Sequence, residues 1–175
     1  SGQLVLQVAN ADQSLAFGAE VCAVGDVDGD GIDELAISAA GCTERGAGPG
    51  VVAIVSGRTG RQVHELRGDR RGDQFGTRLL PLPDWRGDGR PALVVVASRG
   101  GAFGNGYLRV FDVRSGQPLQ TYVGSLAHSA FAISLVDLGD RDGDGLREIG
   151  AMTLARGGTA GLWLMSYGDL PRGAA

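Results

Sequence analysis

An acidic nine-residue motif occurs twice in this chain and constrains the fold more than any other feature. Its copies span Asp26 to Glu34 and Asp140 to Glu148. Each copy has carboxylates at positions 1, 3, 5 and 9 and a glycine at position 6, where the chain can turn sharply because no side chain clashes. Carboxylates this close together repel one another unless a cation neutralises them. The motif therefore predicts a metal-binding loop.

The ligand chemistry of the motif favours Ca²⁺. All the side chains offer oxygen, and calcium accepts about six to eight oxygen ligands in a flexible shell, whereas Mg²⁺ retains its waters. At position 7 a backbone carbonyl would complete the set. The predicted ligands are Asp26, Asp28, Asp30, Ile32 and Glu34 in the first loop, and Asp140, Asp142, Asp144, Leu146 and Glu148 in the second.

The motif is not an EF-hand, whose loop needs a bidentate glutamate at position 12 and a helix on each side. Position 12 is Ile37 in one copy and Ala151 in the other. The flanks of the first copy, Val21 to Val24 and Leu35 to Ser38, are short apolar runs without helical periodicity. We therefore expect a metal loop that joins the two strands of a hairpin.

The acidic loops belong to a larger repeat. Phenylalanines at 17, 75 and 131 each precede by nine residues the aspartates at 26, 84 and 140. Each unit continues with an apolar strand, a glycine-rich connection, a strand, a tight turn and, in the first two units, a further strand. The predicted repeats span about 17–67, 75–123 and 131–167. A four-stranded antiparallel unit at this interval is typical of a propeller blade.

These units resemble the FG-GAP repeats of the integrin α-subunit β-propeller and its bacterial relatives. The residues that carry the resemblance are Phe17-Gly18, Phe75-Gly76 and Phe131, each with the acidic loop that follows it. The resemblance implies an all-β propeller domain over residues 1–175, with four-stranded blades and calcium in the loop between the first two strands of a blade. It also implies a binding or adhesion role outside cells. At position 9 the family usually has Asp, and this chain has Glu.

The middle loop, Asp84 to Ala92, departs from the motif. It has Arg86 at position 3 and Ala92 at position 9, so two carboxylates are missing. We expect this loop to be metal-free, with Arg86 or Arg90 paired with Asp84 or Asp88. The alternative is that Arg86 simply points into water.

The two ends of the chain predict an interlocking closure. The last repeat has no fourth strand, and residues 3–9 form an orphan outer strand that is expected to complement that incomplete last blade. Ordinary propellers have about four to eight blades. Three blades therefore favour either a homodimer that exchanges end strands to give six blades, or a segment of a longer propeller.

Composition limits the remaining function classes. The net charge is −4 and the arginines are scattered, which argues against nucleic acid as a partner. No apolar run is long enough for membrane insertion, and no targeting signal lies in this sequence. Cys22 and Cys42 allow at most one disulfide, and a hairpin symmetric about its loop would place Cys22 opposite a residue near Ser38, so that Cys42 lies too far along to pair without a bulge. That leaves a free thiol as the favoured state and the disulfide as the alternative.

The functional expectation is a non-catalytic module with structural calcium that binds a protein or glycan outside the cell, at the cell surface or in the periplasm. No Ser-His-Asp spacing, phosphate loop or Cys/His zinc pattern indicates an enzyme. Two alternatives stay open. One is a sugar-acting enzyme or lectin-like propeller of the polysaccharide lyase type, with Trp85 as a stacking aromatic. The other is an architectural repeat of a larger surface protein.

Overall fold

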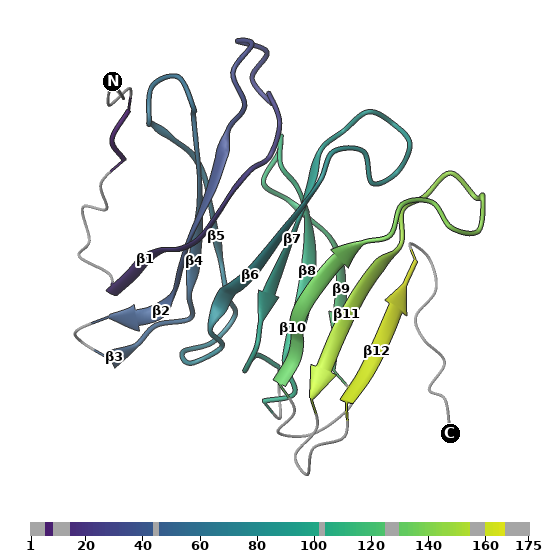
Figure 1. Cartoon of the computed structure of the whole chain (residues 1–175). Helices are drawn as coiled ribbons and strands as arrows, with labels where there is room; N and C mark the ends of the chain where they lie inside the picture. The colour runs from purple at the N-terminus through teal and green to yellow at the C-terminus, as the bar shows by residue number, and fades with distance from the viewer. Residues whose placement is uncertain are drawn as a thin grey trace, which may run out of the picture.

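The computed structural model describes residues 6–8, 15–43, 46–101, 104–124, 130–154 and 160–166. These residues form strands and no helix, so none of them provides a helix that could cross a membrane. The strands make three antiparallel sheets that follow one another in chain order (Figure 1). The predicted all-β fold, with sheets like the blades of a propeller, is confirmed, and the row of sheets is not closed into a ring.

Each sheet is a simple meander. The first contains β1 (Leu15–Ala23), β2 (Leu35–Thr43), β4 (Val51–Val55) and β5 (Gln62–Arg67), with the short β3 (Gly46–Ala47) beside β2. The second contains β6 (Phe75–Leu82), β7 (Ala92–Ala97), β8 (Tyr107–Asp112) and β9 (Pro118–Val123). The third contains β10 (Ala130–Asp137), β11 (Ile149–Leu154) and β12 (Ala160–Met165).

The core lies between the sheets, and β7 shows why its sequence is apolar throughout. All six of its residues are buried. Leu93 and Val95 pack in the cluster shared with the first sheet, whereas Val94 and Val96 pack in the cluster shared with the third. A strand with a sheet on each face has no water-facing side, so it loses the alternation of polar and apolar residues.

Glycines allow the phenylalanine of each following sheet to approach closely. A Cβ atom on Gly68 would lie 2.8 Å from the Cβ of Phe75, and one on Gly106 would lie 2.7 Å from the Cβ of Phe131. Both phenylalanine side chains are fully buried. The abundance of glycine in this chain therefore serves the packing between sheets as well as the turns.

The residue after each phenylalanine has a left-handed backbone. Gly76 has a φ of 93°, and a Cβ atom there would lie 3.0 Å from that of Ser38 in the first sheet. Gly18 has the same conformation, but nothing lies within 4 Å of its added Cβ, because none of the described sheets precedes its own in the row. Ala132, with a φ of 53°, holds this position in the third sheet.

The described parts of the two chain ends lie at opposite ends of the row (Figure 1). Residues 6–8, the described part of the predicted outer strand 3–9, are not in a strand. Val8 instead packs against Ile37, Ala53 and Val55 of the first sheet. Within one chain this segment and β12 do not meet, so the expected complementation of the last blade does not form there.

The register of the first hairpin gives the exact partner of Cys22, which was expected near Ser38. Its partner across the ladder is Ala36 and not Ser38, because the loop closes with a hydrogen bond from the Val24 N–H to the Glu34 carbonyl oxygen. The side chain of Cys42 lies outside the described residues. Cys22 is a free thiol, and burial, with a smaller contribution from Glu20, raises its pKa to about 11.

Candidate metal centres

The three acidic loops lie along the same edge of the row, the upper edge in Figure 1, where the first strand of each sheet connects to the second. Two of them are in close contact. A Cβ atom on Gly87 of the middle loop would lie 2.9 Å from the Gly145 carbonyl oxygen. The Arg147 N–H donates to the Trp85 carbonyl oxygen at 3.1 Å.

In the first loop, Asp26 organises the turn. Its carboxylate accepts hydrogen bonds from the N–H groups of Gly29 (2.7 Å), Asp30 (3.1 Å) and Gly31 (2.8 Å). Gly29 and Gly31 both have positive φ, which brings these N–H groups around the carboxylate. The bond from Gly31 is the largest cause, and together these bonds hold the pKa of Asp26 below its usual value.

The loop of the third sheet repeats this arrangement. The Asp140 carboxylate accepts from the N–H groups of Gly143 (2.7 Å) and Gly145 (3.0 Å). The Leu138 N–H donates to the Glu148 carbonyl oxygen at 2.9 Å and closes the loop as in the first sheet. Two segments distant in sequence therefore fold into the same acidic turn.

Each loop gathers three of its predicted ligands. Oxygens of Asp26, Asp28 and Glu34 lie within 4.8 Å of one another, and so do those of Asp140, Asp142 and Glu148. Such a group is a candidate metal site, although exposed acids also gather without an ion.

The glutamate of each cluster is its most informative member. Glu34 is fully buried, and its Oε2 accepts a hydrogen bond of 2.7 Å from the Val27 N–H. Glu148 is also buried, and its Oε2 accepts a bond of 2.7 Å from the Arg141 N–H. The Oε1 atoms of both glutamates are buried and have no hydrogen-bond partner among the described residues. A buried carboxylate oxygen without a partner is unfavourable unless a cation contacts it, so both sites fit Ca²⁺.

The other predicted ligands lie outside these clusters. Asp30 uses its Oδ2 to accept a hydrogen bond of 2.7 Å from Arg58 in the turn between β4 and β5. The Oδ1 atoms of Asp30 and Asp144 accept from the N–H groups of Ile32 and Leu146. The role of the Ile32 and Leu146 carbonyls as ligands stays a prediction.

The middle loop keeps the turn without the ligand set. The Asp84 carboxylate accepts from the Gly89 N–H at 3.0 Å, as Asp26 does from Gly31. Arg90 lies 4.0 Å from Asp88, which is one of the expected pairs at a long distance. Arg86 is half-buried and its guanidinium lies 5.6 Å from the centre of the Trp85 ring, so it is not simply in water.

Trp85, the stacking aromatic of the lectin-like alternative, is not exposed. Its side chain is 1% exposed and belongs to the cluster between the second and third sheets. The ring is covered because its loop leans against the next sheet, and it is not available to stack on a sugar.

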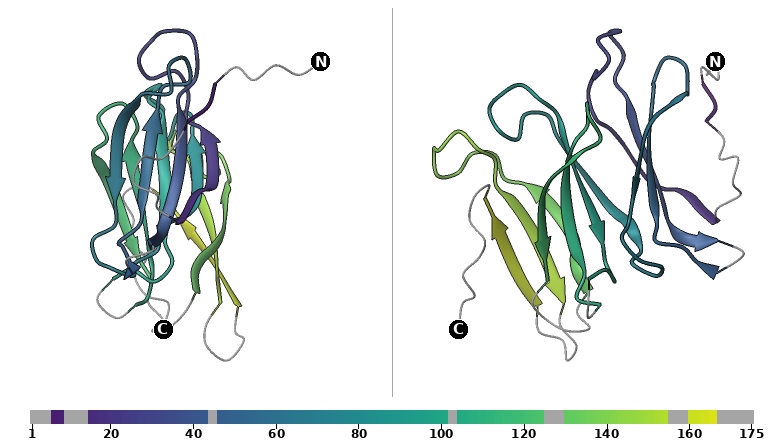
Figure 2. Two further views of the ribbon diagram at one scale, coloured as in Figure 1. Left: turned by 90° about the vertical axis from the view of Figure 1, so that its left-hand side faces the viewer. Right: turned by 180° about the vertical axis from the view of Figure 1, so that it is seen from behind.

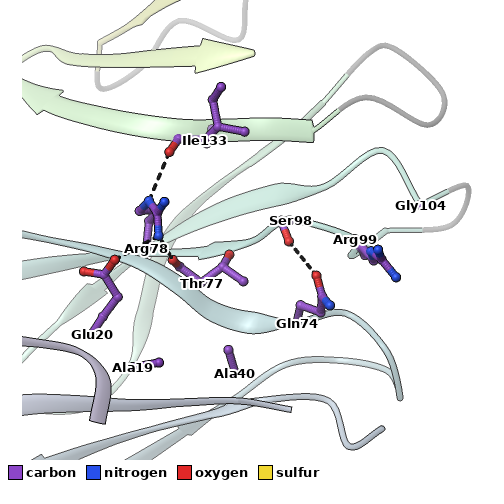
Figure 3. A pocket seen from close by; sticks show the side chains of 11 residues that line it. Ala19, Glu20, Ala40, Gln74, Thr77, Arg78, Ser98, Arg99, Gly104 and Ile133 are labelled. Carbon is purple, nitrogen blue, oxygen red and sulfur yellow. Dashed lines mark hydrogen bonds and ion pairs between the residues drawn. The ribbon is translucent and has the colours of Figure 1, made fainter. Parts of the chain in front are cut away.

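A cavity of about 840 Å³ lies between the inner strands of the three sheets (Figure 3). Arg78 is at its centre and bridges all three sheets. It donates to Glu20 Oε1 of β1 at 2.9 Å, to the Thr77 carbonyl oxygen of its own strand at 2.8 Å, and to the Ile133 carbonyl oxygen of β10 at 3.0 Å. Arg78 and Glu20 therefore tether the sheets to one another.

A model of the FG-GAP repeat family matches residues 17–55. This range starts at the first Phe-Gly pair and runs through the first acidic loop to the end of β4. No curated protein matches the chain. Residues 17–55 are therefore an FG-GAP repeat, on the first of three propeller-like sheets.

Proposed function

We propose that this chain is a calcium-stabilised, non-catalytic propeller module that binds a protein or glycan outside cells. The observation that supports calcium most strongly is the pair of buried, unpartnered Oε1 atoms of Glu34 and Glu148, each beside two aspartates. Asp26, Asp28 and Glu34 would hold one ion, and Asp140, Asp142 and Glu148 a second. Each ion would neutralise the carboxylates of a loop and so stabilise the connection between the two strands of a hairpin.

The expected affinity is that of an extracellular calcium module, with a Kd of about 10⁻⁴ to 10⁻³ M. At a calcium concentration ten times the Kd, each site adds about 1.4 kcal/mol to the free energy of unfolding. Calcium near the millimolar range would therefore stabilise the protein measurably.

The test is a calcium titration of chelator-treated protein, followed by calorimetry and by the melting temperature. We expect saturable binding and a rise in melting temperature. Glu34→Gln and Glu148→Gln should each remove one site, because the amide has nearly the same shape without the charge. Ala92→Gln on the middle loop is the matched control and should leave the calcium response unchanged. Absence of heat and of any thermal shift in millimolar calcium would contradict the proposal.

The alternative is a sugar-acting or lectin-like propeller, and the cavity around Arg78 is the observation that favours it. Its lining includes Glu20, Arg78 and Arg99 but, among the described residues, no aromatic side chain for stacking on a sugar ring. A glycan array and a polysaccharide cleavage assay separate the two functions. An architectural repeat, the remaining alternative, predicts no ligand besides the metal in either assay.

A further inference from the structure

We propose that the cavity around Arg78 binds an acidic segment of a partner protein, whose carboxylates enter it. This inference rests on the proposed binding role and names the class of partner, and it does not depend on calcium. The first strands of the three sheets, β1, β6 and β10, lie along one side of the row, where β6 contacts both of the others (Figure 2). The cavity lies between these strands and extends to the connection between β7 and β8.

The repeat does not require the polar side chains that line the cavity in the second unit. Gln74 stands directly before Phe75, and Ser98 and Arg99 follow β7. Counted from the acidic loops, the first unit has Ala16, Ala40 and Gly41 at these places, and the third has Ala130, Leu154 and Ala155. Sheets of this kind therefore form without the three polar residues, and their presence in the second unit needs another reason.

Gln74 has an unfavourable backbone conformation. Its φ is 56°, in the left-handed region that residues other than glycine seldom adopt. Its Oε1 accepts a hydrogen bond of 3.0 Å from the Ser98 hydroxyl, which holds the amide at the wall of the cavity (Figure 3). A glycine would adopt this backbone without strain, so the strain indicates that the side chain has a use.

The cavity has more unused donors than acceptors. The Nη2 of Arg78, the guanidinium of Arg99 and the Nε2 of Gln74 have no hydrogen-bond partner among the described residues. Glu20 is the only acid among the described lining residues, and its Oε1 is already paired with Arg78 at 2.9 Å. Two arginines beside one glutamate favour an anionic ligand, because each of these donors can bind a carboxylate oxygen.

Arg78 can bind such a ligand without leaving its present partners. Its Nε and Nη1 donate to Ile133, Glu20 and Thr77, which fixes the guanidinium between the sheets. The side chain is still 49% exposed, so the Nη2 is accessible. A guanidinium that is already held loses little further freedom when a ligand binds.

The rest of the lining favours a peptide over a sugar. It consists of small and aliphatic residues, with no aromatic ring among the described ones to cover the apolar face of a sugar. A peptide carries N–H and C=O groups beside its carboxylates. The Nε2 of Gln74 and the Oε2 of Glu20, which has no partner among the described residues, can pair with these groups. The volume of about 840 Å³ lies in the usual range for ligand sites.

The cavity and the candidate metal centres lie toward opposite ends of the strands. Phe75 pairs with Ala97 at the end of the hairpin where Gln74 and Ser98 lie. Leu82 pairs with Ala92 at the other end, beside the middle acidic loop. Peptide binding and calcium binding can therefore be tested separately.

The test is a titration with a capped peptide that has two adjacent glutamates among glycines and serines. Calorimetry measures the affinity, and amide NMR shifts locate the site. The control ligand has glutamines in place of the glutamates. We expect saturable binding of the acidic peptide only, weaker at high salt, with shifts at the Gln74 side-chain amide and at Ser98.

Two variants test the named side chains. Arg99→Gln should weaken peptide binding about tenfold or more, because a charge-assisted hydrogen bond is lost. Arg61→Gln is the matched control, since it removes the same charge from an exposed arginine just before β5 and should leave the affinity unchanged. Gln74→Gly should weaken binding without lowering the melting temperature, because glycine accepts the left-handed backbone.

Several results would overturn the proposal. They are absence of binding at millimolar peptide, equal weakening by Arg99→Gln and Arg61→Gln, or a Gln74→Gly variant that binds normally and melts earlier. Tighter binding of an oligogalacturonate than of the acidic peptide would overturn the assigned partner in favour of an acidic glycan. A calcium-induced rise in melting temperature without peptide binding would overturn this inference and leave the calcium proposal standing, and peptide binding without a calcium response would do the reverse.

Discussion

The first and middle acidic loops share a turn but differ in what they can bind. In both, the aspartate at position 1 accepts a hydrogen bond from the glycine N–H at position 6, Gly31 or Gly89. At position 9 the first loop has buried Glu34 and the middle loop has buried Ala92. The shape of the turn therefore depends on positions 1 and 6, whereas the ligand set depends on positions 3 and 9.

The middle loop, which lacks the carboxylates at positions 3 and 9, has the largest apolar side chain of the three loops at position 2. Position 2 is Val27 in the first loop, Trp85 in the middle loop and the exposed Arg141 in the third. Trp85 is among the largest fully buried side chains of the described residues. We infer that a loop of this shape can be stabilised by a cation, by an apolar anchor or, as in the first loop with its buried Val27, by both. The substitutions below compare these contributions with that of the hydrogen bonds that form the turn.

The largest effect is expected from Trp85→Ala. Removing a fully buried aromatic side chain destabilises a protein by about 3–5 kcal/mol. Arg141→Ala at the equivalent exposed position of the third loop should change stability by less than about 0.5 kcal/mol. Urea unfolding measures both. Equal losses for the two variants would break the comparison.

An intermediate effect is expected when the middle loop is given the missing carboxylates. Arg86→Asp with Ala92→Glu restores positions 3 and 9, and in chelator it should lower the melting temperature because the new carboxylate at position 9 would be buried without a cation. Added calcium should recover the loss and contribute about 1.4 kcal/mol at ten times the Kd. The single Ala92→Glu variant is the control. A double variant that calcium does not rescue would show that the ligand set needs more than these positions.

The smallest effect concerns acid stability in chelator. The pKa of Asp26 is lowered in the folded state by the N–H groups of Gly31, Gly29 and Asp30. Its ionised form therefore contributes stability above the unfolded pKa of about 3.9, and this contribution is lost as the pH falls through the lower folded value. Asp26→Asn should flatten the acid limb of the stability profile, measured by urea unfolding between about pH 2 and 5. An unchanged limb would mean that these hydrogen bonds do not favour the ionised form.

Much of the fold could be predicted because its determinants repeat along the sequence. The spacing from Phe17 to Asp26, repeated from Phe75 and Phe131, places the same hairpin in each sheet. The clusters around Glu34 and Glu148 follow from the same repetition, since a short loop limits where its carboxylates can lie.

The details that could not be predicted depend on contacts between segments that are distant in the sequence. The hydrogen bond from Arg58 to Asp30 joins residues on different loops, and the burial of Trp85 depends on the sheet that follows it. The exact partner of Cys22 is Ala36, two residues before Ser38, because the loop closes with a pair, Val24 and Glu34, that symmetry about the motif does not give. Such details require the packed structure.

The position of β7 has a consequence for how the molecule opens. This strand has hydrogen-bonded neighbours on both edges and packed sheets on both faces, so water reaches its amides only when the sheets separate. Amide hydrogens in such a strand exchange through global unfolding, whereas outer segments exchange through local fluctuations. We therefore expect the middle sheet, whose loop lacks the carboxylates at positions 3 and 9, to be the slowest of the three described sheets to exchange its amide hydrogens.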